Sequence, residues 1–181
     1  NVSRKAIKEG IENVLKIPGR FEIIDGGPYY KATVVVDYAH TPDSLEKVIK
    51  TAKEVAEAKV ITVFGCGGDR DTTKRPEMGE VAARLSDFTI LTSDNPRSEE
   101  PEKIIDEIEA GVKKVKEANY ICLINRHEAI SAAIKMAKKG DFVIIAGKGH
   151  EKGQIFKNKV LPFSDQEVAS EAMRRFSSCS I

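Results

Sequence analysis

The hydrophobic positions of this chain repeat one pattern, in which a short apolar run is followed by apolar residues at helical spacing. Five runs lack polar alternation, which is typical of strands covered on both faces: 33–36, 60–64, 88–92, 120–124 and 142–146. Four sets of residues recur three and four positions apart, and each predicts a helix: Leu45, Val48, Ile49, Ala52, Val55 and Ala56; Met78, Val81, Ala82 and Leu85; Ile104, Ile105, Ile108 and Val112; and Ile130, Ala133, Ile134 and Ala137. Strands that alternate with helices through right-handed crossovers form an open parallel sheet.

The remaining stretches depart from this repeat. Residues 20–25 and 29–33 flank Gly26-Gly27, which predicts a turn between two antiparallel strands at the edge of the sheet. Residues 3–15 predict a lone amphipathic helix. Asp165 is predicted to cap a last helix, and the serine-rich end after that helix is predicted to fray. The predicted fold is therefore α/β: a Rossmann-like, open, mostly parallel sheet with helices on both faces and an antiparallel edge hairpin.

Length, charge and cysteine content narrow the class of protein. A chain of 181 residues fits one domain with a short appendage. Its 29 basic and 28 acidic residues leave a net charge of +1, so no large field favours nucleic acid. No apolar run approaches the roughly 20 residues that span a bilayer, and the first residues lack the apolar stretch of a secretory signal. We therefore expect a cytoplasmic protein that binds neither nucleic acid nor membrane. The three cysteines form no CxxC pair, which predicts reduced thiols rather than a disulfide framework or a zinc knuckle.

Polar loops follow four of the predicted strands. Their sequences are DYAHTPD at 37–43, GCGGDRD at 65–71, SDNPR at 93–97 and GKGHE at 147–151. Ligands of open parallel sheets bind beyond the carboxyl ends of the strands, where the loops diverge. We therefore expect the four loops to share one rim and one ligand.

The residue types of these loops indicate a charged small molecule. Glycines at 65–68 let the backbone approach a ligand, and Arg70 adds a planar guanidinium suited to carboxylate or phosphate. In DNPR, Arg97 could bind a carboxylate while Asp94 and Asn95 face an ammonium group. Blander interpretations remain open: a glycine-rich turn with solvated charges, and a DNPR turn that only leads into a helix.

Several other chemistries are weaker alternatives. Arg70 stands where a dinucleotide fingerprint requires its third glycine, and Gly149 stands where a phosphate loop requires Ser or Thr. Cys66 could be a nucleophile, but no spacing fixes a base near it. His40 lies between Asp37 and Asp43, which would favour its protonated form if the three are close. His150 could donate or accept a proton, or serve only as a hydrogen-bonding spacer. Two further residues are expected to be structural: Cys122 in the core and His127 at the surface.

Five motifs in order resemble the Mur ligases: PGRFE at 18–22, DYAHTPD, GCGGDRD, DNPR and AGKGHE at 146–151. The resemblance covers nearly the whole chain but only the last domain of such an enzyme. It is strongest to the branch that adds meso-diaminopimelate to UDP-N-acetylmuramoyl-L-alanyl-D-glutamate, a precursor of peptidoglycan. It implies a three-domain cytoplasmic enzyme, in which residues 1–17 are the tail of a central ATPase domain and residues 18–181 form the C-terminal, amino-acid-recruiting domain.

The resemblance also implies an activity and a set of site residues. The family uses ATP and Mg²⁺ to form an acyl phosphate on D-glutamate, which the diaminopimelate amine then attacks. The residues that match its diaminopimelate contacts are Arg70, Asp94, Asn95, Pro96, Arg97, Gly147 and Glu151. Arg20 and Asp37 match positions that reach ATP, and His40 lies in the same motif. The phosphate loop and the magnesium ligands belong to domains outside this chain, so we expect no catalytic residue, no metal ligand and no turnover in this chain alone.

Three alternatives to that activity remain. One is a homologue that adds L-lysine, since loop sequence and choice of amino acid need not correspond across a family. Another is a different ligase of the superfamily, such as a cyanophycin or folylpolyglutamate synthetase. The third is a binding module that senses an amino acid or a nucleotide without catalysis, which the absence of a phosphate loop keeps open.

Overall fold

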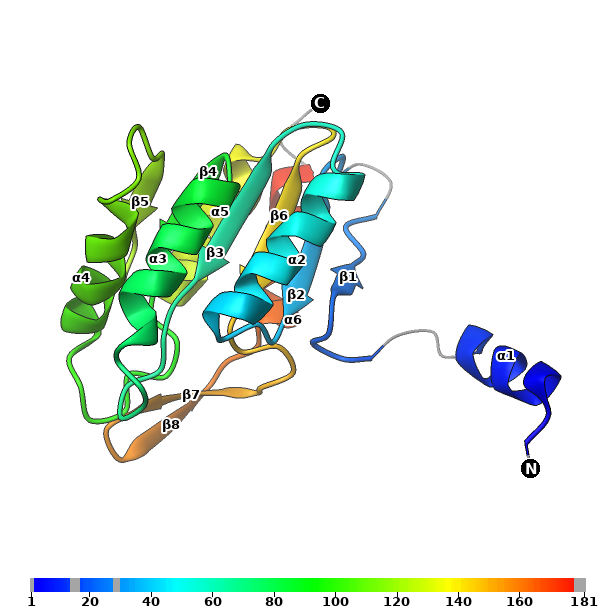
Figure 1. Ribbon diagram of the computed structural model, residues 1–181, viewed down its shortest axis with the longest axis horizontal. Helices are drawn as coiled ribbons and strands as arrows, with labels where there is room; N and C mark the ends of the chain where they lie inside the picture. Colours follow the sequence, from blue (N-terminus) through cyan, green and yellow to red (C-terminus); the bar gives the residue numbers. More distant parts are fainter. Residues whose placement is uncertain (1, 14–16, 28–29, 178–181) are drawn as a thin grey trace.

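The computed structural model describes residues 2–13, 17–27 and 30–177, and its centre is a six-stranded sheet (Figure 1). The strands in chain order are β1 (Glu22–Ile24), β2 (Thr33–Asp37), β3 (Val60–Phe64), β4 (Phe88–Leu91), β5 (Tyr120–Cys122) and β6 (Phe142–Ala146). Their spatial order is β1-β2-β6-β3-β4-β5. β1 runs antiparallel to β2, and the other neighbours run parallel to each other. The predicted mostly parallel sheet with an antiparallel edge is confirmed.

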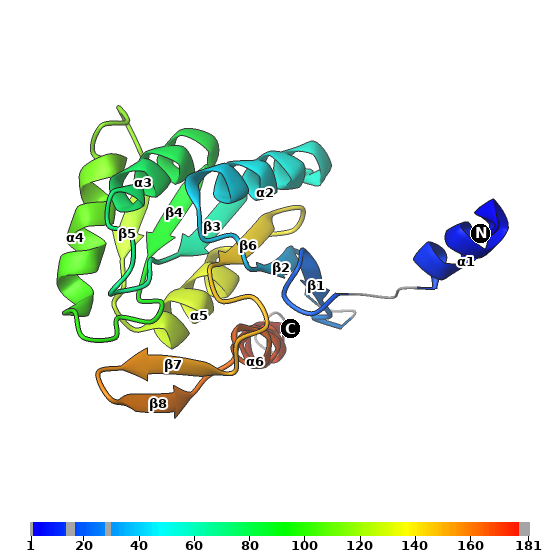
Figure 2. The same ribbon diagram turned by 60° about the horizontal axis from the view of Figure 1, so that its bottom comes forward.

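Helices cover both faces of this sheet (Figure 2). One face carries α2 (Pro42–Val55), α3 (Lys74–Leu85) and α4 (Pro101–Val112), and the other carries α5 (Arg126–Met136) and α6 (Asp165–Ser177). Alternate residues of a strand feed the two cores: in β6, Ile144 packs with the first group of helices and Ile145 with the second. Burial on both sides explains why the central strands are apolar without interruption.

Two of the helices that follow strands, α2 and α5, begin at residues whose side chains cap them. Thr41 and Ser44 form a reciprocal capping box at the start of α2, with Pro42 at the first helical position. The side chain of Asn125 accepts hydrogen bonds from two backbone amides at the start of α5. Each such cap contributes about 1 kcal/mol, and together they fix where the chain leaves the sheet.

The predicted edge hairpin has different bounds in the structure. β1 pairs directly with β2, in a register that sets Glu22 opposite Val36. Residues 30–32 belong to a connecting loop, so among the described residues of the predicted strand over 29–33 only Thr33 lies in a strand. The physical reason is packing by Tyr30, whose hydroxyl donates to the Ile134 carbonyl oxygen of α5 at 2.9 Å. Tyr29, the first residue of that prediction, lies outside the described part of the chain.

The far edge of the sheet is more exposed than predicted. β5 ends at Cys122 rather than continuing to Ile124, and Cys122 is exposed, so the prediction that it is a core residue is wrong. An edge strand has one neighbour, and here the helices leave part of this run uncovered: Ile121 of β5 is 36% exposed, and Ile124, after the strand, is 45% exposed. The apolar run at 120–124 therefore does not form a buried strand.

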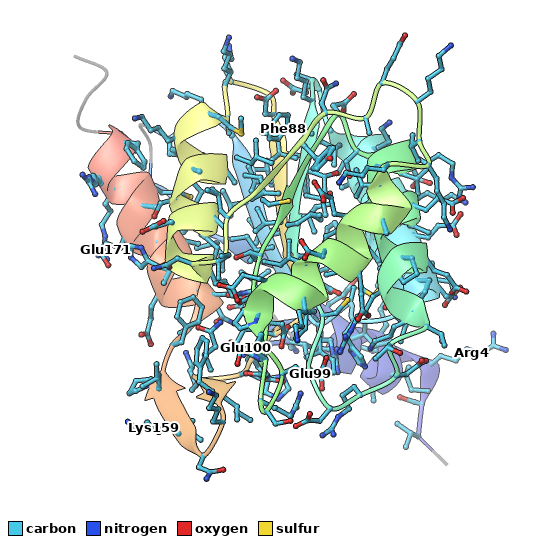
Figure 3. The ribbon with its side chains drawn as sticks, turned by 90° about the vertical axis from the view of Figure 1, so that its left-hand side faces the viewer. Arg4, Phe88, Glu99, Glu100, Lys159 and Glu171 are labelled. Atoms are coloured by element: carbon cyan, nitrogen blue, oxygen red, sulfur yellow. The ribbon has the colours of Figure 1, made fainter. Side chains whose placement is uncertain are left out.

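A second, two-stranded sheet was not predicted. β7 (Gly153–Phe156) and β8 (Lys159–Pro162) form an antiparallel hairpin whose turn is Lys157-Asn158. The hairpin lies below the carboxyl edge of the main sheet in Figure 1. Figure 3 shows its Lys159 at the same end of the molecule as Glu99 and Glu100, and far from Phe88 at the start of β4. The hairpin is therefore placed to take part in a site at that edge.

Helix α1 (Arg4–Glu12) stands apart from the sheet and has no buried residue (Figure 1). The Ser3 side chain caps it, and Ile7 and Ile11 on its apolar side are 50% and 69% exposed. The predicted amphipathic helix is confirmed within residues 4–12. Throughout the described residues, no helix is long and apolar enough to cross a membrane.

Candidate functional site

The loops at the carboxyl ends of β2, β3, β4 and β6 converge on one cavity of about 300 Å³. Its walls combine charged side chains of both signs with glycine backbone. The lining residues are Tyr38, His40, Gly65, Cys66, Gly67, Arg70, Asp71, Lys74, Asp94, Asn95, Arg97, Gly147 and Glu151. The four loops that the sequence analysis placed on one rim therefore do share one mouth.

Glycine is required where the loop after β3 meets the loop after β4. A Cβ at Gly68 would lie 1.9 Å from the Pro96 carbonyl oxygen, and one at Gly65 would lie 2.0 Å from that of Thr92. The close approach lets the Gly68 amide donate to the Asn95 carbonyl oxygen at 2.9 Å. The two loops consequently form one layer of backbone under the cavity.

The hairpin β7–β8 holds the loop after β4 from the other side. Gln154 donates to the Asp94 carbonyl oxygen at 2.7 Å, and the Ile155 amide donates to Asn95 Oδ1 at 3.0 Å. The Arg97 amide donates to the Ile155 carbonyl oxygen at 3.0 Å, which makes a short parallel bridge with the hairpin. Arg97 has a φ of 52°, a left-handed backbone conformation that residues other than glycine rarely adopt. The contacts with the hairpin hold Arg97 in this conformation.

The two arginines of the cavity keep donors available for a ligand. Arg97 Nη1 donates to the carbonyl oxygens of Gly68 and Asn95 at 2.9 and 3.4 Å. Within the described part of the chain, its Nη2 and Nε make no hydrogen bond. Arg70 is exposed and uses Nη1 on the Asp69 carbonyl oxygen. Both guanidinium groups can therefore receive a carboxylate.

Acidic groups face these arginines across the cavity. Burial raises the pKa of the Asp94 carboxyl, and this effect is opposed by Arg126 and Lys148. For Glu151, burial also acts to raise the pKa, but hydrogen bonds from Asn95 and Lys148 outweigh it, so its pKa is lowered. A carboxylate that stays ionised suits an ammonium group of a ligand.

An aromatic and cationic cluster adjoins the cavity through Tyr38 and His40, and it is built from the segment before β1 and the loops after β2 and β6. The Arg20 guanidinium stacks 4.3 Å above the Tyr38 ring, and the rings of His40 and His150 lie 4.6 and 5.7 Å from it. The Asp37 carboxylate accepts from the backbone amides of Phe21 and Ala39, both at 2.7 Å. Asp37 thus supports the backbone on both sides of this cluster.

The sequence analysis considered a close approach of His40 to Asp37 and Asp43, but the hydrogen bonds of these three residues go to other partners. His40 Nδ1 lies 2.8 Å from the Tyr38 carbonyl oxygen. The nearby carboxylates are used elsewhere, since Asp37 binds backbone amides and Asp43 pairs with Lys47 at 2.8 Å.

A buried ion pair ties two of the loops to a helix. Arg126 and Asp165 are fully buried and form two hydrogen bonds of 2.8 Å. Arg126 also donates to the carbonyl oxygens of Ser93 and Ala146, at the ends of β4 and β6. Asp165 was predicted to cap α6, but the Ser164 hydroxyl accepts from the Glu167 amide and takes that role. The prediction for Asp165 is wrong because its carboxylate is committed to Arg126.

Comparison with known proteins identifies the family. The model of the "Mur ligase, glutamate ligase domain" matches residues 19–149, more than half of the chain. The chain belongs to the Mur ligase family. A protein of Syntrophomonas wolfei named UDP-N-acetylmuramoyl-L-alanyl-D-glutamate--2,6-diaminopimelate ligase is 52% identical over 168 residues, which are 93% of this chain and 34% of that protein. The chain thus spans about a third of the length of the relatives it matches.

Two solved structures have the same fold as this chain. A structure of a UDP-N-acetylmuramoyl-L-alanyl-D-glutamate--2,6-diaminopimelate ligase superposes with a TM-score of 0.80 at 37% identity, covering 96% of this chain and 35% of that one. E. coli FolC in complex with ADP superposes with a TM-score of 0.61 at 25% identity, covering 83% of this chain and 33% of that one. The Rossmann-like class that the sequence predicts is confirmed by these neighbours.

The predicted site residues of this Mur ligase domain fall into two groups. Seven line the cavity: His40, Arg70, Asp94, Asn95, Arg97, Gly147 and Glu151. Arg20 and Asp37 reach it only through Tyr38 and the backbone, and Pro96 is not part of its wall. The sequence analysis missed the supporting residues Lys148, Gln154 and Arg126, whose roles depend on contacts between distant segments. The only indication in the sequence was that Lys148 directly follows Gly147, a predicted site residue.

Cys66 lines the cavity but is built as a structural residue. It is 3% exposed, its Sγ lies 3.7 Å from Met78 Sδ, and burial raises its pKa to about 12. We expect iodoacetamide at pH 8 to leave Cys66 unmodified in the folded chain while it labels the exposed Cys122, because only the thiolate reacts. Peptide mapping by mass spectrometry checks this, with urea-unfolded chain as the control. Equal labelling of both would show that Cys66 is an accessible thiol.

Proposed function

We propose that this chain is the C-terminal, amino-acid-recruiting domain of an ATP-dependent ligase that adds meso-diaminopimelate to UDP-N-acetylmuramoyl-L-alanyl-D-glutamate. The observation that carries the proposal is the single cavity that Arg70, Arg97, Asp94 and Glu151 line together. The names of relatives about 50% identical point to the same reaction. In this proposal the full-length protein works in the cytoplasm, and its partners are these two substrates rather than nucleic acid or membrane.

The charge pattern of the cavity matches meso-diaminopimelate. That amino acid carries two carboxylates and two ammonium groups. The cavity is lined by three cationic side chains, Arg70, Lys74 and Arg97, and by three carboxyl groups, Asp71, Asp94 and Glu151. Asn95 and the backbone at Gly147 complete the wall with neutral polar atoms. L-lysine lacks one of the carboxylates and would leave the free side of Arg97 unpaired, at a cost in affinity.

The cluster around Tyr38 supports a role beside ATP. Arg20 and His40 present a cation and a ring at the rim, and Asp37 holds the backbone that carries them. A relative of this fold is a complex with ADP. The resemblance to the Mur ligases assigns Mg²⁺ to the domains outside this chain, and the proposal keeps it there.

The domain contributes positioning in this proposal. The ligase forms an acyl phosphate on D-glutamate, the amine of meso-diaminopimelate attacks it, an amide forms and phosphate leaves. The cavity holds the attacking amine near that group when the domains close, which removes the entropy cost of a bimolecular encounter. This chain alone binds the amino acid and does not turn over.

Two observations weigh against the other candidate functions. The free guanidinium donors of Arg97 favour meso-diaminopimelate over L-lysine. FolC, at 25% identity, is far less similar to this chain than the diaminopimelate ligases are. A module that senses an amino acid without catalysis would bind but would not restore ligation when joined to its upstream domains.

Calorimetric titration of this chain with meso-diaminopimelate and with L-lysine tests the proposal. We expect meso-diaminopimelate to bind at least tenfold more tightly, since one charge-assisted pair contributes about 1.5 to 3 kcal/mol. D-glutamate, with two carboxylates and one amine, is a control for carboxylate binding without the second ammonium group. Equal affinity for L-lysine, or no heat from either amino acid, would overturn the assignment.

A further inference from the structure

Lys148 is a fully buried lysine that contacts two residues of the cavity wall, Asn95 and Glu151, and the proposed function gives it no role. Its side chain is 0% exposed. Its Nζ donates to Asn95 Oδ1 at 2.9 Å and to Glu151 Oε2 at 3.0 Å. Removing an ammonium group from water is costly, and an apolar residue of similar volume could fill the same space. A buried cation therefore calls for an explanation beyond packing.

The contacts of Lys148 determine how Glu151 faces the cavity. Glu151 Oε2 accepts from both Lys148 Nζ and Asn95 Nδ2, the latter at 2.8 Å. Within the described residues, Oε1 accepts no hydrogen bond and remains available to a ligand. Oε2 therefore holds the carboxylate in place, and Oε1 is the oxygen that a ligand can contact.

The same lysine fixes Asn95. Asn95 Oδ1 accepts from Lys148 Nζ and from the Ile155 amide of β7, and its Nδ2 donates to Glu151. Most of the hydrogen-bonding capacity of this side chain is spent inside the protein. Asn95 consequently links the loop after β4, the loop after β6 and the hairpin into one network.

We propose that Lys148 is a positioning residue, which keeps Glu151 ionised and aims its free oxygen at an ammonium group of the bound diamino acid. The proposal rests on the proposed function for the identity of the ligand. Lys148 itself does not contact the ligand and acts through Glu151. Other residues contact the ligand, and Lys148 determines the charge and the orientation of one of these residues, Glu151.

The charges around Glu151 determine the sign of the pH effect. Lys148, Arg97 and Arg126 stabilise its ionised form, while Asp94 disfavours it. Its pKa is lowered, so the ligand contact is complete at neutral pH and is lost as the pH falls through that pKa. Without the cation, burial is less well opposed, and the loss begins at a higher pH.

The test compares Lys148→Met with Lys152→Met, a control on an exposed lysine four residues further along. Titration of the Glu151 carboxyl by NMR in the ligand-free chain is expected to show a higher pKa in Lys148→Met and no change in Lys152→Met. Affinity for meso-diaminopimelate at pH 7 is expected to fall on the order of tenfold in Lys148→Met, the loss of one hydrogen bond to a charged group. The fall should grow as the pH is lowered. If Lys148→Met does not fold, Lys148→Gln keeps a donor without the charge and should show the same upward shift.

A double-mutant cycle separates positioning from a purely structural role. In a Glu151→Gln background, Lys148→Met should have little further effect on affinity, because its action passes through that carboxylate. An unchanged Glu151 titration, or a loss of affinity that is independent of pH and of Glu151, would overturn the proposal. The NMR titration needs no ligand, so it judges Lys148 separately: a wild-type chain that binds no amino acid contradicts the proposed function instead.

Discussion

Replacing Asp165 by alanine is expected to lower the free energy of unfolding by about 3 to 5 kcal/mol, the usual cost of breaking a buried ion pair from one side. The carboxylate is 0% exposed and binds Arg126 through two hydrogen bonds of 2.8 Å. In the variant, the guanidinium stays buried without a counter-ion. Urea unfolding followed by circular dichroism measures the change, with the slope of the transition checked for constancy.

Two further variants define what this result means. Glu167→Ala removes the acid of an exposed pair on the same helix and is expected to leave stability nearly unchanged. Replacing both Arg126 and Asp165 by leucine and methionine should cost less than Asp165→Ala, because no uncompensated charge remains. If Asp165→Ala unfolds at the same urea concentration as the wild type, the pair is not a structural tie.

The same ion pair illustrates what sequence could and could not predict. Arg126 is the first residue of α5 and Asp165 the first residue of α6, and polar side chains at such positions are ordinarily solvated. Their contact joins residues 39 apart, and no local periodicity encodes it. Prediction placed Asp165 as a cap because capping is a local property, whereas the tertiary contact decided its role.

The location of the site was predictable for a geometric reason. Carboxyl ends of parallel strands share one edge, so motifs after β2, β3, β4 and β6 had to lie near one another. Arg70, Arg97 and Glu151, from three different loops, do line one cavity. Which donors remain free could not be predicted, since that depends on the carbonyl oxygens that Arg97 meets.

The hairpin β7–β8 is the main feature that the sequence analysis missed, and it matters to the site. Its strands have four residues each, and the exposed β8 has no buried face to give a periodic signal. Yet the hairpin holds the backbone of Asp94 and Arg97 and the side chain of Asn95. The loop that we propose to contact the ligand is thus shaped by a segment about 60 residues away, as the separation of Gln154 from Asp94 shows.

Because the hairpin holds the backbone of Arg97, the variant Arg97→Ala should affect mainly the side-chain contact. Affinity for meso-diaminopimelate should fall roughly 10- to 100-fold, while affinity for L-lysine stays within about twofold. The free Nη2 and Nε of Arg97 are the donors proposed to bind the carboxylate that L-lysine lacks. Alanine keeps a Cβ at a φ of 52°, so the backbone strain and the bridge to the hairpin are the same in both proteins. Calorimetric titration of both amino acids, under one buffer condition, measures the two losses.

The selectivity of the loss carries the conclusion, and two matched variants isolate it. Arg84→Ala removes an exposed arginine of α3 and should change neither affinity, which controls for net charge. Arg97→Lys keeps the charge without the planar pair of donors, and its affinity should lie between wild type and Arg97→Ala. A parallel fall for both amino acids would mean that Arg97 shapes the cavity as a whole. In that case, the Arg97 guanidinium would not be the group that distinguishes meso-diaminopimelate, with its second carboxylate, from L-lysine.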